Sequence, residues 1–413
     1  MSYRHIEEVH ELIKTTMDEV FSLKPKKNQL EAISHLILMS LEKIPIKPLL
    51  LCQPTGCGKS MVRDVFASSV GGITINIAPL LSLNADQNNK LKSKIKCKNV
   101  HCIHLDEYDN KSHVTKINQL LRLHPVNSSL TIIVFTSPQR LLKYNQYIET
   151  IYALMKEKTL KLISVDEIQL FTQFGLWFRV EFLKLKEVLF EKTKNKIPLL
   201  FMTASANKTM LHYFKLITSV DFDNNNVMWP NVKGMSSRQQ EIIFNPSSQF
   251  HRIIRPIAKN IDNKKFIVYG NSRKQIIKKY DRLRTWLDIH IPSLDLISIV
   301  GTFKKEVKLH RTQLFLGNKI VSNTNNNDQG IDNNNIYNPQ GCFATRSLGS
   351  SGWDSNLIRS VISIDFPTDI LSIQQEKGRC GRYNNAVGSD NNYFVLGILK
   401  KMEYIFERIL DYN

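Results

Sequence analysis

The segment at residues 53–60 has the residue types and spacing of a phosphate-binding loop. It reads QPTGCGKS, follows an apolar run at residues 48–52 that predicts a buried strand, and precedes residues 61–70, which can continue as a helix. A strand, a glycine-bearing loop, Lys-Ser and a helix in this order can hold a nucleoside triphosphate. An ordinary glycine turn is the alternative, because Gln53 stands where the strict pattern begins with Gly.

Each residue type in this loop has its own chemical use. Gly56 and Gly58 allow backbone N–H groups to turn inward around a phosphate, and the N-terminus of the following helix adds the positive end of its dipole. Lys59 can reach the β- and γ-phosphates, and Ser60 can offer its hydroxyl to Mg²⁺. The predicted nucleotide contacts in this loop are Thr55, Gly56, Cys57, Gly58, Lys59 and Ser60.

An acidic pair, Asp166-Glu167, follows the apolar residues 162–165. In open α/β sheets, ligands bind at the carboxyl ends of the strands. There Asp166 would hold Mg²⁺, and Glu167 would orient or deprotonate an attacking water. Such a pair is often only a helix N-terminus with favourable charge, but its combination with the phosphate loop favours metal-assisted hydrolysis.

Two arginines near the end of the chain, Arg379 and Arg382, are three residues apart and therefore share one helical face. An arginine from a second domain can reach a γ-phosphate and stabilise transition-state charge, an effect on the order of 10³–10⁵ in rate. A solvated basic turn is the alternative interpretation. The predicted catalytic residues are Lys59, Asp166, Glu167, Arg379 and Arg382.

Composition narrows the class of protein. The chain has 413 residues, 42% of them apolar, and a formal charge of +19, which favours a polyanionic partner such as nucleic acid over a basic surface with no partner. It contains no apolar run of membrane-spanning length and no signal-peptide pattern, so we expect a soluble intracellular protein, nuclear in a eukaryote and otherwise cytoplasmic. Its six cysteines include no Cys-x-x-Cys pair, so no structural zinc is expected.

Apolar runs alternate with helical stretches twice along the chain, which predicts two α/β domains with mostly parallel sheets flanked by helices. Residues 4–21 predict an amphipathic helix, residues 221–234 a linker, and the Asn-rich residues 323–338 a surface insertion. We place the two domains at residues 1–230 and 231–413. The predicted strands lie at residues 48–52, 73–78, 131–135, 162–165, 198–202, 266–269, 296–300, 342–345, 361–364 and 393–396.

Further segments make the chain resemble superfamily 2 helicases, and within them the RecQ family, from about residue 21 to residue 382. Residues 26–33, KKNQLEAI, are similar to the RecQ adenine-binding motif, with Gln29 in the adenine-contacting place. Residues 78–87, APLLSLNADQ, are very similar to RecQ motif Ia. The remaining motifs resemble Ib at residues 136–141, III at 203–206, IV at 271–273, V at 344–354 and VI at 374–382.

The resemblance implies two tandem RecA-like P-loop domains with ATP and Mg²⁺ bound in the cleft between them. It also implies an ATP-dependent DNA helicase or translocase that moves in the 3′-to-5′ direction on single-stranded or partly duplex DNA. The sequence does not indicate an oligomeric state. Beyond the phosphate loop, the implied nucleotide contacts are Gln29, Gln169, Gly352 and Asp354.

Residues 170–179, LFTQFGLWFR, resemble the aromatic-rich loop that couples single-stranded DNA to ATP hydrolysis in RecQ enzymes. Exposed aromatic rings can stack on bases, at roughly 1–3 kcal/mol per base, and an arginine can pair with phosphate. The alternative is that these rings belong to the core. The implied DNA contacts are Gln173, Phe174, Trp177, Phe178 and Arg179, with Pro79, Ser82, Ser137, Pro138, Arg140, Ser272, Arg273 and Thr345.

The sequence departs from the RecQ pattern in several places. Gln169 stands where His is usual, and Pro25-Lys26 where an aromatic residue and Arg are usual. Motif V carries an extra residue, and the zinc-binding, winged-helix and HRDC modules have no counterpart. Two other interpretations therefore stay open, which are a decayed nucleic-acid-binding protein derived from a mobile element and an RNA helicase of the same superfamily.

Overall fold

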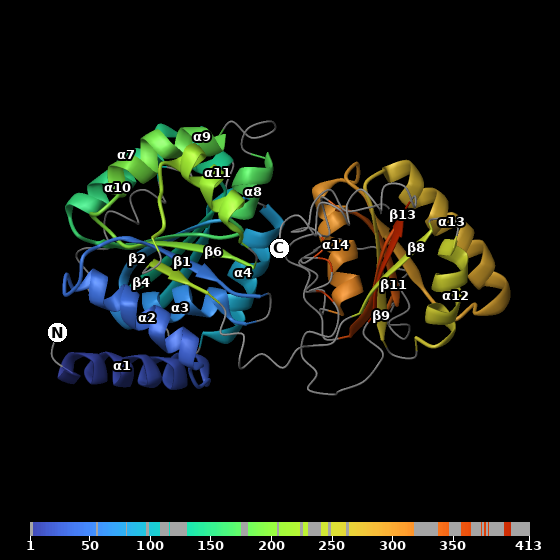
Figure 1. Ribbon diagram of the computed structural model, residues 1–413, viewed down its shortest axis with the longest axis horizontal. Coiled ribbons are helices and arrows are strands. Elements are labelled where there is room, and N and C mark those ends of the chain that lie inside the picture. Colours follow the sequence, from blue (N-terminus) through green and yellow to red (C-terminus); the bar gives the residue numbers. More distant parts are fainter. Residues whose placement is uncertain are drawn as a thin grey trace, which may run out of the picture. The chain divides into compact units, whose positions relative to one another are not determined.

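The computed structural model divides the chain into two compact units, Met1–Met235 and Ser236–Asn413 (Figure 1). The boundary predicted at residues 230 and 231 lies outside the residues that the structure describes. Among the described residues, no helix is long and apolar enough to cross a bilayer. The structure describes residues 3–54, 57–79, 81–95, 99–107, 115, 130–174, 181–204, 206–223, 226–229, 241–246, 249–261, 264–317, 338–346, 357–364, 373, 376, 379 and 392–397.

The described part of the first unit contains a seven-stranded sheet in the order β3-β4-β2-β5-β6-β1-β7, and every neighbouring pair is parallel. Two of these strands were not predicted, and one of them, β7, lies inside the segment interpreted as a linker, where it pairs with β1. The strands are β1 (Pro48–Cys52), β2 (Gly72–Ile77), β3 (Val100–His104), β4 (Thr131–Thr136), β5 (Leu160–Val165), β6 (Leu199–Thr203) and β7 (Val227–Met228).

Helices cover both faces of this sheet, with α1, α2 and α3 on one face and α7 to α11 on the other (Figure 1). The amphipathic helix predicted at residues 4–21 is α1, and it buries Val9, Ile13 and Met17, which are spaced by one turn, in the core shared with α2 and α3. The helices are α1 (Tyr3–Phe21), α2 (Lys27–Ser40), α3 (Lys59–Val70), α4 (Leu81–Lys94), α6 (Pro138–Lys143), α7 (Asn145–Lys156), α8 (Gln169–Phe174), α9 (Glu181–Leu185), α10 (Glu191–Thr193) and α11 (Lys208–Thr218), with a 3₁₀ turn η1 (Leu105–Glu107) and a π-helical turn η3 (Lys186–Phe190).

The described part of the second unit contains a six-stranded sheet in the order β10-β11-β9-β12-β13-β8, again with parallel neighbours. Side chains alternate along β9, so Phe266 and Val268 pack in the core with α12 and α13, while Ile267 and Tyr269 face the core with α14 (Figure 1). The elements are β8 (Glu241–Pro246), α12 (Phe250–Lys259), β9 (Lys265–Gly270), α13 (Arg273–His290), β10 (Leu296–Ile299), α14 (Lys305–Leu316), β11 (Gly341–Thr345), β12 (Ile358–Ser363) and β13 (Asn392–Gly397).

The two parallel sheets with helices on both faces confirm the predicted fold class. All ten predicted strands are present, because each is a short apolar run of the kind that a sheet covered on both faces requires. The prediction missed β3, β7 and β8. Strand β7 is only two residues long, and β3 is half-exposed over most of its length, so neither forms an uninterrupted apolar run.

Candidate active site

The strand order of the first unit brings three of the predicted motifs to one edge of the sheet. The acidic pair follows β5 and the phosphate loop follows β1. Strand β6 lies between these two strands, so the end of β6 lies between the two motifs. Backbone hydrogen bonds connect neighbouring strands at this edge. Gln53 N donates to Thr203 O at 3.1 Å, and Asp166 N donates to Ile77 O at 3.0 Å. Thr203 therefore stands between the loop and the carboxylates.

The phosphate loop leads into α3 through a glycine that no other residue could replace without strain. Gly58 has φ +88°, and a Cβ at this position would fall 2.3 Å from Nε2 of Gln29. Gln29 is buried, and its Nε2 donates to the carbonyl oxygen of Gly58 at 3.2 Å, while its Oε1 accepts from Lys26 N at 3.0 Å. The residue predicted to contact adenine thus also fastens the start of α2 to the phosphate loop.

The ammonium group of Lys59 lies against the backbone of the loop. Its Nζ donates to Gln53 O at 2.8 Å and to Pro54 O at 3.3 Å. Phosphate oxygens are acceptors of the same kind and carry more negative charge, so they can replace these carbonyls. Thr55 and Gly56 lie outside the described residues.

The acidic pair is held by side chains on both sides. Asp166 is buried, and its Oδ1 accepts from Glu167 N at 2.9 Å. Glu167 has φ +52°, a left-handed conformation that is costly for a residue with a side chain and that also occurs at active sites. Gln169 Nε2 donates to Glu167 Oε2 at 2.5 Å, and Thr203 Oγ1 donates to Gln169 Oε1 at 2.8 Å. Gln169 therefore joins the acidic pair to the end of β6.

A buried polar network behind Asp166 was not predicted from the sequence. Gln87, on α4, donates from Nε2 to Asp166 Oδ2 at 2.6 Å and accepts at Oε1 from Arg63 at 2.9 Å and from Asn76 at 3.3 Å. Arg63 also pairs with Asp64 at 2.6 Å. Burial raises the pKa of the Asp64 carboxyl, and the charge of Arg63 opposes that rise. Gln87 thereby fixes the orientation of the carboxylate predicted to hold Mg²⁺.

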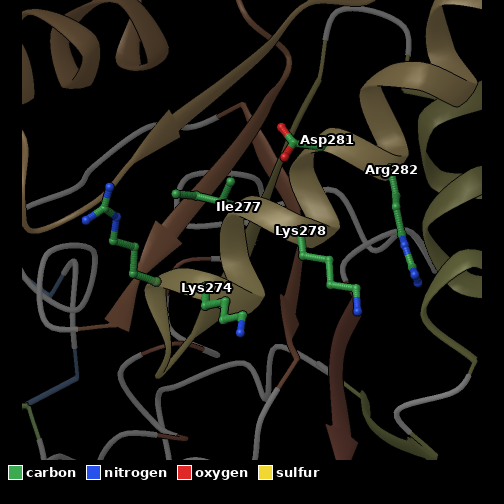
Figure 2. A pocket seen from close by; sticks show the side chains of 6 residues that line it. Lys274, Ile277, Lys278, Asp281 and Arg282 are labelled. Atoms are coloured by element: carbon green, nitrogen blue, oxygen red, sulfur yellow. The ribbon is translucent and has the colours of Figure 1, made fainter.

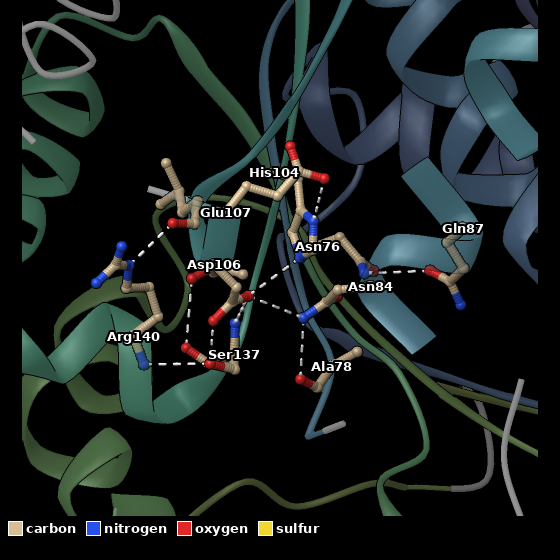
Figure 3. Close-up of polar contacts among 11 residues, drawn as sticks. Asn76, Ala78, Asn84, Gln87, His104, Asp106, Glu107, Ser137 and Arg140 are labelled. Carbon is tan, nitrogen blue, oxygen red and sulfur yellow. Dashed lines mark hydrogen bonds and ion pairs between the residues drawn. The ribbon is translucent and has the colours of Figure 1, made fainter. Parts of the chain in front are cut away.

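A second polar cluster lies under the segment that resembles motif Ib. Figure 3 shows Asp106 facing Ser137, Asn84 and His104. Ser137 donates to Asp106 from its backbone N at 2.9 Å and from Oγ at 2.5 Å, and Asn84 Nδ2 lies 3.4 Å from Oδ2 of the same carboxylate. Arg140 is buried and donates from Nε to Leu105 O at 2.9 Å. The side chains of Ser137 and Arg140 therefore hold the segment that resembles motif Ib against Leu105 and Asp106. Their contacts with DNA stay predictions.

In the second unit, the residues from motifs IV and V lie at the carboxyl ends of neighbouring strands. Ser272 is the residue before α13, Arg273 is exposed at its start, and Thr345, at the end of β11, pairs in register with Gly270 of β9. These residues follow two adjacent parallel strands, so they gather at one edge of the sheet.

A buried ion pair underlies Arg379. The guanidinium group of Arg346 contacts Glu376, Asn271 and Ser363, and Glu376 also accepts a hydrogen bond from Tyr393 at 2.8 Å. Burial raises the pKa of Glu376, against the opposing charge of Arg346. The backbone N of Arg379 donates to Glu376 O at 3.0 Å, so this pair fixes the turn that carries one predicted catalytic arginine.

The other predicted site residues are described only in part. Pro79 is buried at the end of β2. Pro138 is buried in the first turn of α6. The backbones of Ser82, Gln173 and Phe174 belong to α4 and α8. Those lying outside the described residues are Thr55, Gly56, Trp177, Phe178, Arg179, Gly352, Asp354 and Arg382.

The residues at the edge of the first sheet fit a magnesium nucleotide. Asp166 accepts a hydrogen bond from Glu167 N at Oδ1 and one from Gln87 at Oδ2, and each carboxylate oxygen keeps further acceptor capacity for a cation. Ser60 lies in the first turn of α3, next to Lys59. Asp166 and Ser60 could therefore hold the ion, and Lys59 and the turn at Gly58 could hold the phosphates.

Sequence comparison finds similarity to helicases. Residues 26–212 match the DEAD/DEAH box helicase family. The chain is 24% identical over 337 residues to the ATP-dependent DNA helicase RecQ of Bacillus subtilis, covering 80% of this chain and 48% of the relative. It is 23% identical over 344 residues to the RecQ helicase of Pasteurella multocida, covering 81% and 46%. The chain thus spans about half the length of these curated relatives.

Solved helicase structures share the fold. The DUF1998 helicase MrfA bound to DNA superposes with a TM-score of 0.67 at 15% identity, covering 96% of this chain and 53% of the other. Dbp5 of S. cerevisiae bound to RNA and ADP BeF3 superposes with a TM-score of 0.64 at 15% identity, covering 98% and 93%. The chain therefore matches the DEAD/DEAH box helicase family over residues 26–212, is similar to RecQ helicases over about 80% of its length, and shares the fold of solved helicases.

Proposed function

We propose that this chain is an ATP-dependent DNA helicase or translocase that couples ATP hydrolysis to movement along a single strand. The main support is the arrangement at one edge of the first sheet. Lys59, the acidic pair and Thr203 lie together there, and Gln169 bridges Glu167 to Thr203. Movement in the 3′-to-5′ direction is part of the proposal and rests only on the resemblance of the sequence motifs to the RecQ family.

In the proposed reaction, Lys59 exchanges the carbonyl oxygens of the loop for phosphate oxygens and so places the γ-phosphate. Glu167 orients the attacking water and accepts its proton, while Gln169 keeps the carboxylate of Glu167 in position. When bound, Mg²⁺ supplies positive charge next to the phosphates, with Asp166 and Ser60 as its protein ligands. The role of Arg379 toward the γ-phosphate is part of the same proposal.

The proposal also gives a route from nucleic acid to the catalytic carboxylates. Pro79 and Ser82, which are predicted DNA contacts, lie just before and within the first turn of α4, and Gln87 lies further along the same helix. Because Gln87 donates to Asp166, a strand that repositions α4 would act directly on Asp166. The route needs no rearrangement of the sheet.

The test is ATP hydrolysis by the wild type and by Lys59→Ala, each with and without a single-stranded oligonucleotide. We expect stimulation by DNA in the wild type and loss of hydrolysis in Lys59→Ala, because the phosphates lose their ammonium partner. Lys156→Ala, which removes an exposed lysine from α7, serves as the matched control and should behave as the wild type. Tight binding of DNA without hydrolysis in any of the proteins would favour the decayed binding protein.

An RNA helicase is a second candidate, because one solved structure with this fold is Dbp5 bound to RNA. Competition between DNA and RNA strands of the same sequence distinguishes the two. Stronger stimulation of hydrolysis by RNA than by DNA would replace the DNA proposal with the RNA one.

A further inference from the structure

The first half of α13 presents a row of positive charges. Lys274, Lys278 and Arg282 are exposed and follow one another at a spacing of four residues, so they occupy one face of the helix. Figure 2 shows the three side chains extending from the same side of α13, with Ile277 and Asp281 on the neighbouring row. Together with Arg273 these side chains line an open groove of about 590 Å³.

The charges of this row lack acidic partners within the described part of the chain. The structure gives no ion pair and no hydrogen bond from Lys274, Lys278 or Arg282 to any described residue. The second half of the same helix differs, because Arg284 pairs with Asp288 at 3.0 Å and with Asp295 at 3.6 Å. Like charges four residues apart destabilise a helix, so the row costs stability unless an anion lies against it.

Helix α12 extends the positive surface beside the row. Its Arg255 is exposed and lies 5.0 Å from the ring centroid of Trp286 on α13. The pKa of His251 is lowered, first by burial and then by the charges of Lys279, Arg255 and Arg282. Cations from both helices therefore act on the same small region, as in a surface that binds a polyanion.

The row begins at a predicted nucleic-acid contact. Helix α13 starts at Arg273, directly after Ser272, and both residues were predicted to meet the DNA backbone. From Lys274 to Arg282 the helix advances about 12 Å away from that point. We propose that the phosphate backbone of the bound DNA strand continues from Ser272 and Arg273 onto the row formed by Lys274, Lys278 and Arg282. This inference rests on the proposed function for its choice of DNA.

The test compares two triple variants of the full chain. In one, Lys274, Lys278 and Arg282 are all changed to Ala, and in the control Lys192, Lys194 and Lys196 are changed to Ala. The control removes the same charge from exposed positions just before β6, at the amino-terminal edge of the first sheet. Affinity for single-stranded DNA is measured without ATP at several salt concentrations. Each lost phosphate contact reduces the slope of log K against log salt by about 0.7.

We expect the α13 variant to bind more weakly and to reduce that slope by about 2, which is three contacts of about 0.7 each. The control should keep the wild-type slope. Thermal unfolding of the α13 variant should occur at or above the wild-type temperature, because repulsion within the helix is removed and Ala is a strong helix former. An unchanged slope in the α13 variant, or an equal loss in the control, would overturn the proposal.

The outcome is separate from that of the hydrolysis experiment. If the α13 variant keeps the wild-type salt slope and the wild type shows DNA-stimulated hydrolysis, the α13 contact is wrong and the proposed function is retained. If the α13 variant has a reduced salt slope and the wild type does not hydrolyse ATP, the α13 contact is retained and the proposed motor function is wrong.

Discussion

At the scale of single residues, the site depends on side chains that hold other side chains. Gln169 donates from Nε2 to Glu167 and accepts at Oε1 from Thr203. Gln87 donates from Nε2 to Asp166 and accepts at Oε1 from Arg63. An amide is suited to this role because it donates and accepts at once without adding charge. The acidic pair therefore keeps its negative charge for a cation and a water.

Gln87→Ala should weaken the site for Mg²⁺. Residues that hydrogen-bond to metal ligands typically change metal affinity or activity by about 10- to 100-fold when removed. We expect a higher Mg²⁺ concentration at half-maximal ATP hydrolysis and a lower kcat, because Asp166 loses the donor that fixes Oδ2. The measurement is the rate of hydrolysis as a function of Mg²⁺ concentration.

Lys92→Ala, an exposed position on the same helix, should leave the Mg²⁺ dependence of hydrolysis unchanged. If Gln87→Ala lowers only the unfolding temperature and shifts no Mg²⁺ midpoint, Gln87 is a packing residue and the proposed link to Asp166 fails.

At the scale of elements, one buried lysine joins three parts of the second unit. Lys265, at the start of β9, donates from Nζ to Phe315 O at 2.6 Å, to Asn338 Oδ1 at 2.7 Å and to Pro339 O at 3.1 Å. It thus ties the end of α14 to the residues just before β11, which are separated in sequence by the Asn-rich segment. Most of the predicted insertion at residues 323–338 lies outside the described residues, and Asn338 is its last residue.

Lys265→Met should destabilise the second unit by about 1–3 kcal/mol for each acceptor left buried without a donor. Burial lowers the pKa of Lys265 to about 8, below the value of about 10.4 expected for an unfolded chain. Above about pH 8 the unfolded state therefore binds more protons, so this lysine makes the free energy of unfolding rise with pH. Burial raises the pKa of Cys342, whose contribution has the opposite sign once the unfolded thiol ionises.

Denaturant unfolding of the full chain on either side of about pH 8 measures this effect. Because Cys342 contributes to both proteins, the comparison isolates Lys265: the wild type should gain stability relative to Lys265→Met as the pH rises above about 8. Equal pH dependence in the two proteins would show that Lys265 does not change protonation on unfolding in this range.

At the scale of the whole molecule, each unit has its own hydrophobic core and its own parallel sheet. The first unit includes strand β7, which pairs with β1 through Leu50–Val227 and Leu51–Met228. Strand β1 leads directly into the phosphate loop, so the short β7 covers the edge of the strand that positions Lys59.

A fragment of residues 1–223 should therefore be less stable than one of residues 1–235. We expect a difference of about 2 kcal/mol in the free energy of unfolding, from the lost strand pairing and the lost burial of Met228. Denaturant unfolding of both fragments measures it. A third fragment, residues 1–229, keeps β7 and should match the longer one; if it matches the shorter one instead, residues beyond β7 are responsible.

The amino-acid sequence by itself determined the fold class, the resemblance to RecQ helicases and the positions of ten strands along the chain. These follow from local patterns, because apolar runs and glycine-bearing motifs are properties of neighbouring residues. It did not predict β3, β7 or β8. The helicase motifs also placed Lys59, Asp166 and Glu167 in a candidate site, since such chemistry requires those residue types in that order.

Only the tertiary structure decided which side chains hold that site. The contacts of Gln87 with Asp166, of Ser137 with Asp106 and of Arg346 with Glu376 join residues separated by 30 or more positions. Burial directs Nε of Arg140 onto the backbone carbonyl of Leu105, and the DNA contact that its motif implies stays a prediction. A buried polar group must find a partner wherever the packed elements place one, and that partner depends on the order of the strands in the sheet.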